Sequence, residues 1–304
     1  MARLCSSLVA ATAEDPDSAP VPRPTSSASA RMDYGSMLTY TVGLPPVPGK
    51  TNANLALKGI CIRLGASNEA AVCFDTDLLR YYAGWTGGFL DLSKTHLTSY
   101  KGSDHALIQG EVKFQTALEP GWSRAGDFND PRPIQAGPLP PDWGQFRGLY
   151  RHGDRVVLHY VVGGIEVWEM PEFVRTNGVD FFLRNFHLDK SNRNLALRLC
   201  DLEDWRDEES RQQGELSDPA PAGLTPAGNR ATRRIAFNVF RMRNRTVGVG
   251  FMGRPANQRQ ISHLPPLDDL PFPPLVKQQR GRVQLEIPSL STPADFTVIL
   301  WSVP

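Results

Sequence analysis

The sequence has little that would point to a membrane, to nucleic acid or to haem. It contains no run of about 20 apolar residues, the length needed to span a bilayer. Its 33 lysines and arginines nearly balance its 32 aspartates and glutamates, so no net charge favours an anionic partner. Its four cysteines form neither C-x-x-C nor C-x-x-C-H, the motifs of zinc ribbons and of covalently attached haem. We therefore expect no membrane span, no nucleic-acid partner, no metal and no cofactor.

Sustained helical periodicity is also missing, while glycine and proline are abundant, with 26 residues of each. Short strands joined by many turns need this composition. The sequence predicts an all-β protein, a large antiparallel β-sandwich that is either one extended sandwich or two abutting ones, with long Pro- and Gly-rich loops. A β-propeller also uses short strands and Gly-rich turns and is the alternative, although no internal repeat of about 20 to 50 residues supports it.

Alternating apolar residues predict two hairpins. One joins residues 57–64 to 70–74 across the turn at 65–68, and the other joins 155–162 to 165–169 across Gly163-Gly164. The first hairpin brings Cys61 and Cys73 face to face, either as a disulfide or as two buried thiols.

The chain divides into a terminal segment and a folded part. Residues 1–31 carry a weak signal-like leader followed by a linker rich in Pro, Ser and Ala, which is too poor in apolar side chains to fold. Residues 32–304 are expected to form one β-rich domain, with a possible sub-boundary at 201–230. The Pro- and Gly-rich segment 119–144 is long for a loop within a compact domain, which is typical of a functional loop or lid.

Residues 73–92 pack carboxylates, aromatic rings and glycines into one short block, CFDTDLLRYYAGWTGGFLDL. Carboxylates beside aromatic rings are typical of sugar and polyol sites. Ligand-binding candidates from this block and from the long loop are Asp75, Asp77, Arg80, Trp85, Asp91, Trp122 and Trp143. The structural alternative for the block is a turn in which Asp77 caps a short helical turn at 78–82. A pair of catalytic carboxylates is the least favoured interpretation.

His152 and Asp154 are two further ligand-binding candidates, because an imidazole and a carboxylate can share a proton near neutral pH. A β-turn before the following strand is the alternative explanation for Gly153-Asp154. No G-x-S-x-G motif is present, and we assign no catalytic residue. The alternating Arg241, Arg243 and Arg245 either bind an acidic group or pair with the acidic residues at 201–209.

Five segments, 33–42, 58–65, 70–92, 127–133 and 148–164, together resemble an uncharacterised domain on the N-terminal side of large exported bacterial proteins. Those proteins often continue into a sorbosone-dehydrogenase-like propeller and a cytochrome-type haem domain. The resemblance implies a periplasmic or extracellular location, with a cytoplasmic one as the alternative, and a link to carbohydrate oxidation. It supplies no catalytic residues.

Three functions follow as hypotheses. The leading one is an exported, non-catalytic binding or accessory domain that recognises carbohydrate or docks a haem- or propeller-type dehydrogenase partner domain. Sugar rings would stack on exposed indoles, while Asp75, Asp77 and Arg80 would bind hydroxyl groups. The alternatives are a glycan-active enzyme (hydrolase, lyase or epimerase) and a structural scaffold domain.

Overall fold

The computed structural model describes residues 33–46, 54–95, 104–202, 212–214, 236–241, 246–253, 271–279 and 281–303. Within these ranges the chain forms strands, turns and loops, and no helix occurs. Accordingly, none of the described segments is a helix that could cross a membrane. The expected leader and linker over 1–31, most of the expected sub-boundary at 201–230, and Arg243 and Arg245 lie outside the described residues.

The strands form three sheets. The seven-stranded sheet has the spatial order β5 (Leu90–Asp91), β6 (Ala106–Ile108), β1 (Met37–Gly43), β2 (Leu55–Leu64), β3 (Ala70–Asp75), β4 (Arg80–Thr86) and β7 (Glu111–Gln115). The eight-stranded sheet has the order β13 (Gln212–Gly214), β14 (Ala236–Arg241), β15 (Thr246–Gly253), β18 (Ala294–Val303), β11 (Val179–Leu188), β10 (Ile165–Thr176), β9 (Arg155–Val162) and β8 (Gly144–His152). The three-stranded sheet has the order β12 (Leu195–Asp201), β17 (Arg282–Ile287) and β16 (Leu275–Gln279).

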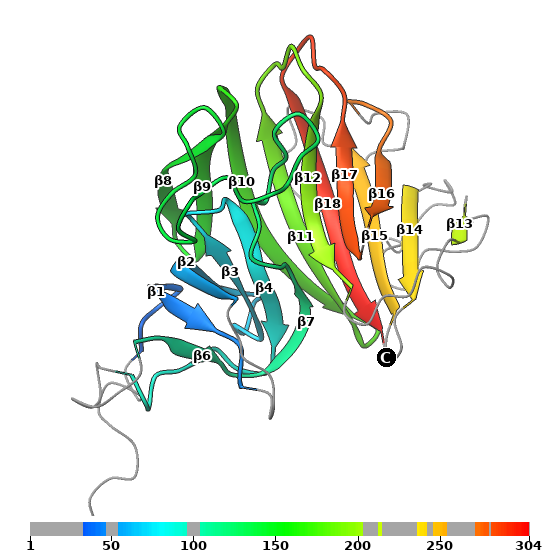
Figure 1. The fold of residues 1–304 in the computed structure, drawn as a ribbon. Coiled ribbons are helices and arrows are strands. Elements are labelled where there is room, and N and C mark those ends of the chain that lie inside the picture. The colour runs from blue at the N-terminus through cyan, green and yellow to red at the C-terminus, as the bar shows by residue number, and fades with distance from the viewer. Residues whose placement is uncertain are drawn as a thin grey trace, which may run out of the picture.

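The two smaller sheets lie against the large one (Figure 1). Phe74 of β3, Phe182 of β11 and Leu285 of β17 belong to the same buried cluster, so all three sheets contribute to one core. The Phe74 and Tyr160 rings, from different sheets, stack with centroids 5.5 Å apart. The all-β sandwich expected from the sequence is therefore confirmed, in a form close to two abutting sandwiches that share one large sheet.

Alternation along the strands of the seven-stranded sheet assigns side chains to two different cores. On β3, Val72 and Phe74 enter the core shared with the large sheet, whereas Ala71 and Cys73 enter a second cluster on the other face. Because both faces of this sheet are covered, β3 and β4 are buried at every position.

Both predicted hairpins are present. Leu64 pairs with Ala70 across the first turn, and Val162 pairs with Ile165 across Gly163-Gly164. Cys61 and Cys73 are cross-strand partners in the first hairpin, and both are buried free thiols. Burial, more than any other effect, raises the pKa of the Cys73 thiol well above its usual value, so this thiol stays protonated.

One structural expectation was wrong. The helical turn suggested for 78–82 does not form, because residues 76–79 make the turn between β3 and β4, and Arg80–Thr86 is a strand. Its residues alternate between two buried faces, so the polar-apolar alternation that marks a half-exposed strand is missing.

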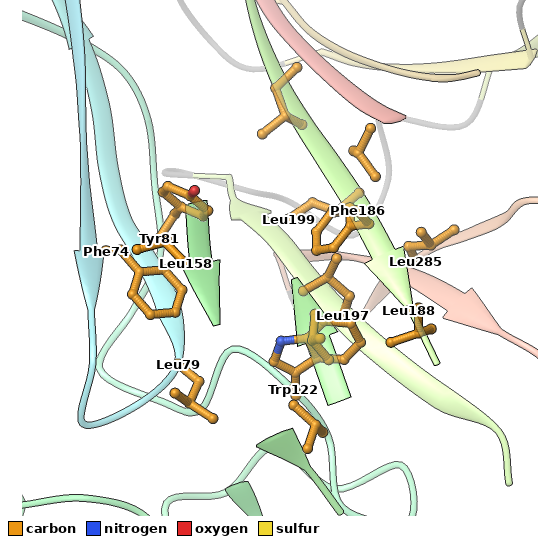
Figure 2. Close-up of a cluster of buried hydrophobic side chains, with 14 of the residues drawn as sticks. Phe74, Leu79, Tyr81, Trp122, Leu158, Phe186, Leu188, Leu197, Leu199 and Leu285 are labelled. Carbon is orange, nitrogen blue, oxygen red and sulfur yellow. The ribbon is translucent and has the colours of Figure 1, made fainter. Parts of the chain in front are cut away.

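The long loop between β7 and β8 attaches to the three-stranded sheet. Ser123 N donates to Ala196 O at 2.9 Å, and Arg198 N donates to Gly121 O at 2.8 Å. Trp122 forms an isolated bridge with Leu197. Figure 2 shows the Trp122 indole inside the core beside Leu197, with Phe74 and Tyr81 to one side and Phe186 to the other. The loop therefore closes the core at the junction of the two smaller sheets.

Candidate functional site

The turn between β3 and β4 positions Asp77 beneath the long loop. Asp77 N donates to Asp75 Oδ1 at 3.1 Å, a side-chain turn of the kind that aspartate favours. On the loop side, Leu139 N donates to Asp77 O at 3.0 Å. Asp77 is thus fixed by its own hairpin and by a segment that lies about sixty residues further along the sequence.

Asp75 and Arg80 hold this turn together from inside. Arg80 Nε donates to Asp75 Oδ2 at 3.1 Å, and both side chains are almost completely buried. The Arg80 guanidinium also donates to the carbonyls of Leu55, Thr116 and Ala117. Burial raises the pKa of Asp75, against the lowering effect of Arg80. These two predicted ligand residues therefore have internal partners and form a structural clamp behind Asp77.

Asp77 has a different environment, because it lines an open pocket. Its Oδ1 lies 3.3 Å from Lys58 Nζ, and the lysine side chain is 61% exposed while that of Asp77 is 5% exposed. The other oxygen, Oδ2, is buried and accepts no hydrogen bond from any residue in the described part of the chain. A buried acceptor without a donor costs about 1–3 kcal/mol, so this oxygen needs an explanation.

The pocket above Asp77, which we call the Asp77 pocket, has a volume of about 760 Å³. This volume lies within the range of about 300–1,000 Å³ typical of small-molecule sites. The polar residues of its lining are Lys58, Thr76, Asp77, Arg132 and Gln145. The apolar wall includes Phe146 and Ile134, which is 75% exposed. The same wall carries a series of proline rings from the long loop, Pro131, Pro133, Pro138, Pro140 and Pro141.

A second ion pair shapes the loop that forms this wall. Arg132 Nε and Nη2 donate to the two oxygens of Asp130 at 2.9 and 2.8 Å, and Nη1 donates to Gly137 O at 2.5 Å. Burial raises the pKa of Asp130, but the Arg132 hydrogen bonds outweigh it and the pKa is lowered overall. This bidentate contact fixes the Pro-rich segment as a preformed wall.

The tryptophans expected to stack against a sugar do not form an exposed platform. Trp85 and Trp122 are completely buried and Trp143 is 5% exposed. Trp143 Nε1 donates to Trp122 O at 2.8 Å, so these two residues are neighbours. The loop contacts Asp77, but its indoles are buried in the core, because a large apolar ring is stabilised more by burial than by contact with water.

Trp85 and Asp91 are separate from the Asp77 pocket. Trp85 packs in the second cluster of the seven-stranded sheet, and its Nε1 donates to Phe89 O at 3.0 Å. Asp91 accepts a hydrogen bond from Ser93 N at 2.8 Å, and bonding from Ser93 lowers its pKa. The neighbouring Gly88 permits a close approach of the chain itself, since a Cβ there would lie 2.4 Å from Gln109 O.

His152 and Asp154 lie at the exposed tip of the β8–β9 hairpin, on either side of Gly153. The β-turn expected as the alternative for Gly153-Asp154 is therefore present. Neither residue lines the Asp77 pocket. Of the nine predicted ligand residues, only Asp77 therefore reaches the pocket, with Asp75 and Arg80 directly behind it.

Four parts of the pocket were not predicted from the sequence, namely Lys58, Gln145, Phe146 and the proline wall. For Lys58 a signal was present, because the register of the first hairpin pairs Gly59 with Asp75 and so places Lys58 opposite Thr76. The structure shows this contact as a hydrogen bond from Thr76 N to Lys58 O at 3.2 Å. The prolines carried no such signal, since their positions depend on how the loop folds back.

In the ranges that the structure describes, no group of three or more His, Cys, Asp or Glu side chains is arranged to hold a metal ion.

The comparisons with known proteins identify a domain without an assigned activity. Residues 72–169 match a family model described as a domain of unknown function, DUF6797. This match confirms the expected resemblance to an uncharacterised domain over that segment, which contains Asp77 and the proline wall. No curated protein matches.

Among solved structures, the chain is similar to "Putative kojibiose phosphorylase from human microbiome", with 9% identity and a TM-score of 0.27. The similarity covers 81% of this chain and 32% of that one, so the chain spans about a third of that structure's length.

Proposed function

We propose that the protein is a non-catalytic carbohydrate-binding domain whose ligand occupies the Asp77 pocket. The observation that carries this proposal is the placement of the Asp77 carboxylate beside the exposed ammonium of Lys58, 3.3 Å away, in the lining of a pocket of about 760 Å³. A hydroxyl group of a ligand in this pocket would donate to the carboxylate.

The pairing of Asp77 with Lys58 favours a diol. One hydroxyl group can donate to the carboxylate, while its neighbour accepts from the lysine ammonium, and the two protein groups are already 3.3 Å apart. Adjacent hydroxyl groups with this donor and acceptor pattern are characteristic of sugars. The proline rings, Phe146 and Ile134 offer an apolar wall for the C–H face of a sugar ring.

Binding is better supported than catalysis. The lining of the Asp77 pocket provides one carboxylate and no histidine, and the neighbouring Asp75 carboxylate is buried and bonded to Arg80, so the pocket does not present a pair of carboxylates to a ligand. A glycan-active enzyme needs such a pair. The proposal retains the periplasmic or extracellular location implied by the resemblance, where a glycan ligand would be encountered.

A glycan array followed by calorimetric titration of the full chain tests this function. We expect saturable binding to at least one glycan, and Asp77→Asn should weaken it by about 10- to 100-fold, since a hydrogen bond to a charged group contributes about 1.5–3 kcal/mol. Lys58→Met, which keeps the aliphatic stem, should weaken it in the same direction.

Glu111→Gln is the matched control, because it removes one carboxylate charge from an exposed side chain outside the pocket. Urea unfolding of each variant confirms that the fold is retained. Unchanged affinity in a folded Asp77→Asn variant would remove Asp77 from the site. Absence of binding to every glycan would favour the scaffold that docks a redox partner domain.

A further inference from the structure

A second pocket lies where three turns of the fold meet. It is formed by the β9–β10 turn at Gly163-Gly164, the β11–β12 connection at 190–193 and the β17–β18 connection at 289–291. Its volume is about 740 Å³, similar to that of the Asp77 pocket. The polar groups in its lining are Lys190, Ser191, Asn192, Arg193, Ser289 and Ser291.

Hydrogen bonds between the turns give this pocket a defined shape. Ser191 and Leu290 exchange two backbone hydrogen bonds of 2.9 and 2.8 Å. Ser289 N donates to Asn194 Oδ1 at 3.0 Å, and Ser191 Oγ donates to Arg193 O at 2.6 Å. The lining is therefore an assembled site from three distant parts of the sequence.

The Arg193 guanidinium lies over the Gly-Gly turn. A Cβ atom on Gly163 would stand 3.2 Å from Arg193 Nη1, so the glycine leaves room for the cation at the rim of the pocket. Gly163 N in turn donates to Trp143 O at 2.8 Å, which anchors the turn to the long loop.

The lining of this pocket contains two cationic side chains and no acidic one. Among the described residues, no carboxylate lies within ion-pairing distance of Lys190 or Arg193. The nearest acids in sequence have other partners, since Asp189 Oδ1 accepts from the backbone N of Lys190 and Glu166 Oε2 lies 2.6 Å from His159 Nε2. Two cations beside serine hydroxyl groups form a set of donors suited to an oxyanion.

We propose that this pocket binds an oxyanion, namely a carboxylate, sulfate or phosphate group, held by Arg193 and Lys190 with Ser289 and Ser291 as further donors. Its charge is opposite to that of Asp77, so it selects a different chemical group. The proposal rests on the three turns alone and does not depend on carbohydrate binding in the Asp77 pocket.

Amide NMR titration of the full chain tests the proposal, with sodium sulfate, sodium phosphate and sodium glucuronate as probes. Sodium chloride at equal ionic strength is the reference, since it reproduces non-specific screening. We expect saturable shifts of the amides of Gly163, Gly164 and Ser191 with at least one probe, at a Kd on the order of 1 mM. Binding of glucuronate but of neither inorganic ion assigns the oxyanion to an acidic sugar, whereas binding of sulfate or phosphate shows that the free ion suffices.

The variants decide which side chains are responsible. Arg193→Gln should weaken binding about tenfold or more, and Lys190→Gln should weaken it as well, because each removes one charge-assisted donor. Arg155→Gln is the matched control, since it removes the same charge from an exposed arginine that does not line the pocket. The proposal is overturned if no probe shifts these amides beyond the chloride reference, or if Arg193→Gln binds as tightly as the unmodified protein.

Discussion

At the scale of single residues, the molecule places several ionised groups deep inside its core. Arg184 Nε donates to Glu169 Oε1 at 2.5 Å, and Glu169 Oε2 accepts from Tyr160 at 2.6 Å and from Arg184 Nη2 at 3.2 Å. Both ionised side chains are almost fully buried. Burial lowers the pKa of Arg184, but the Glu169 carboxylate more than reverses this, so the arginine stays charged. A buried pair of this kind is costly to break because either partner alone is an uncompensated charge.

Arg184→Met should therefore lower the free energy of unfolding by about 3–5 kcal/mol, since it leaves the Glu169 carboxylate buried without its charged partner. The double variant Arg184→Met, Glu169→Leu should recover much of this loss, because it leaves no charge behind. Urea unfolding of the two single variants and the double variant measures the coupling between the residues. Additive losses in the double variant would show that the two charges do not stabilise one another.

The block at 73–92 shows how much a sequence reveals about a candidate site. It was recognised because it combines Asp75, Asp77, Arg80 and Trp85, but residue type does not say which side chain is exposed to solvent. The fold gives Arg80 carbonyl partners from Leu55, Thr116 and Ala117, which are distant in sequence, and this makes it internal. Asp77, in contrast, lies in the lining of the pocket, and that distinction depends on long-range contacts.

At the scale of elements, the pairing of β4 with β7 depends on a small residue facing an aromatic one. Gly84 and Phe114 are direct cross-strand partners, and a Cβ on Gly84 would lie 2.1 Å from Phe114 Cε1. The Phe114 ring cannot simply withdraw, because it is buried against Phe182 with ring centroids 5.3 Å apart. Phe114 thus covers the glycine and links the seven-stranded sheet to the large one.

Gly84→Ala should lower the free energy of unfolding by about 1–3 kcal/mol, the usual cost of an overpacked core. Phe114→Leu should destabilise the unmodified protein, but much less so the Gly84→Ala variant, because the smaller side chain relieves the clash. Thermal and urea unfolding of the four proteins in this cycle measures the difference. Equal effects of Phe114→Leu in both backgrounds would contradict a steric conflict between these two positions.

The elements differ in how well the sequence predicts them, for a physical reason. Hairpins were predicted correctly where a tight turn separates two alternating runs, as at Gly163-Gly164, because turn and strands are encoded locally. Strand β4 was missed because both of its faces are buried, so its residues do not alternate between polar and apolar as in a half-exposed strand. The lining of the Asp77 pocket has the same limitation, since prolines that form a wall look the same in sequence as prolines in any loop.

At the scale of the whole molecule, long-range pairing creates the architecture. Strand β11 pairs with β18 from Asp180 with Ser302 to Leu188 with Ala294, which joins segments more than one hundred residues apart. The sandwich could be predicted from the sequence because each expected strand carries apolar side chains on one face or on both, and such faces must pack against another sheet. Which sheets share a core could not be predicted, since strands of similar composition are interchangeable until the chain has folded.

The shared core makes a prediction about cooperativity. Because Val72, Phe182 and Leu285 come from three sheets yet belong to one buried cluster, no sheet can separate without exposing the apolar surface of another. We therefore expect calorimetry to show a single unfolding transition in which the calorimetric and van't Hoff enthalpies agree. The most protected backbone amides of β3, β11 and β17 should exchange with the same opening free energy in native-state hydrogen exchange. Two resolved transitions, or a lower opening free energy confined to β17 and its sheet, would instead divide the chain into units that fold separately.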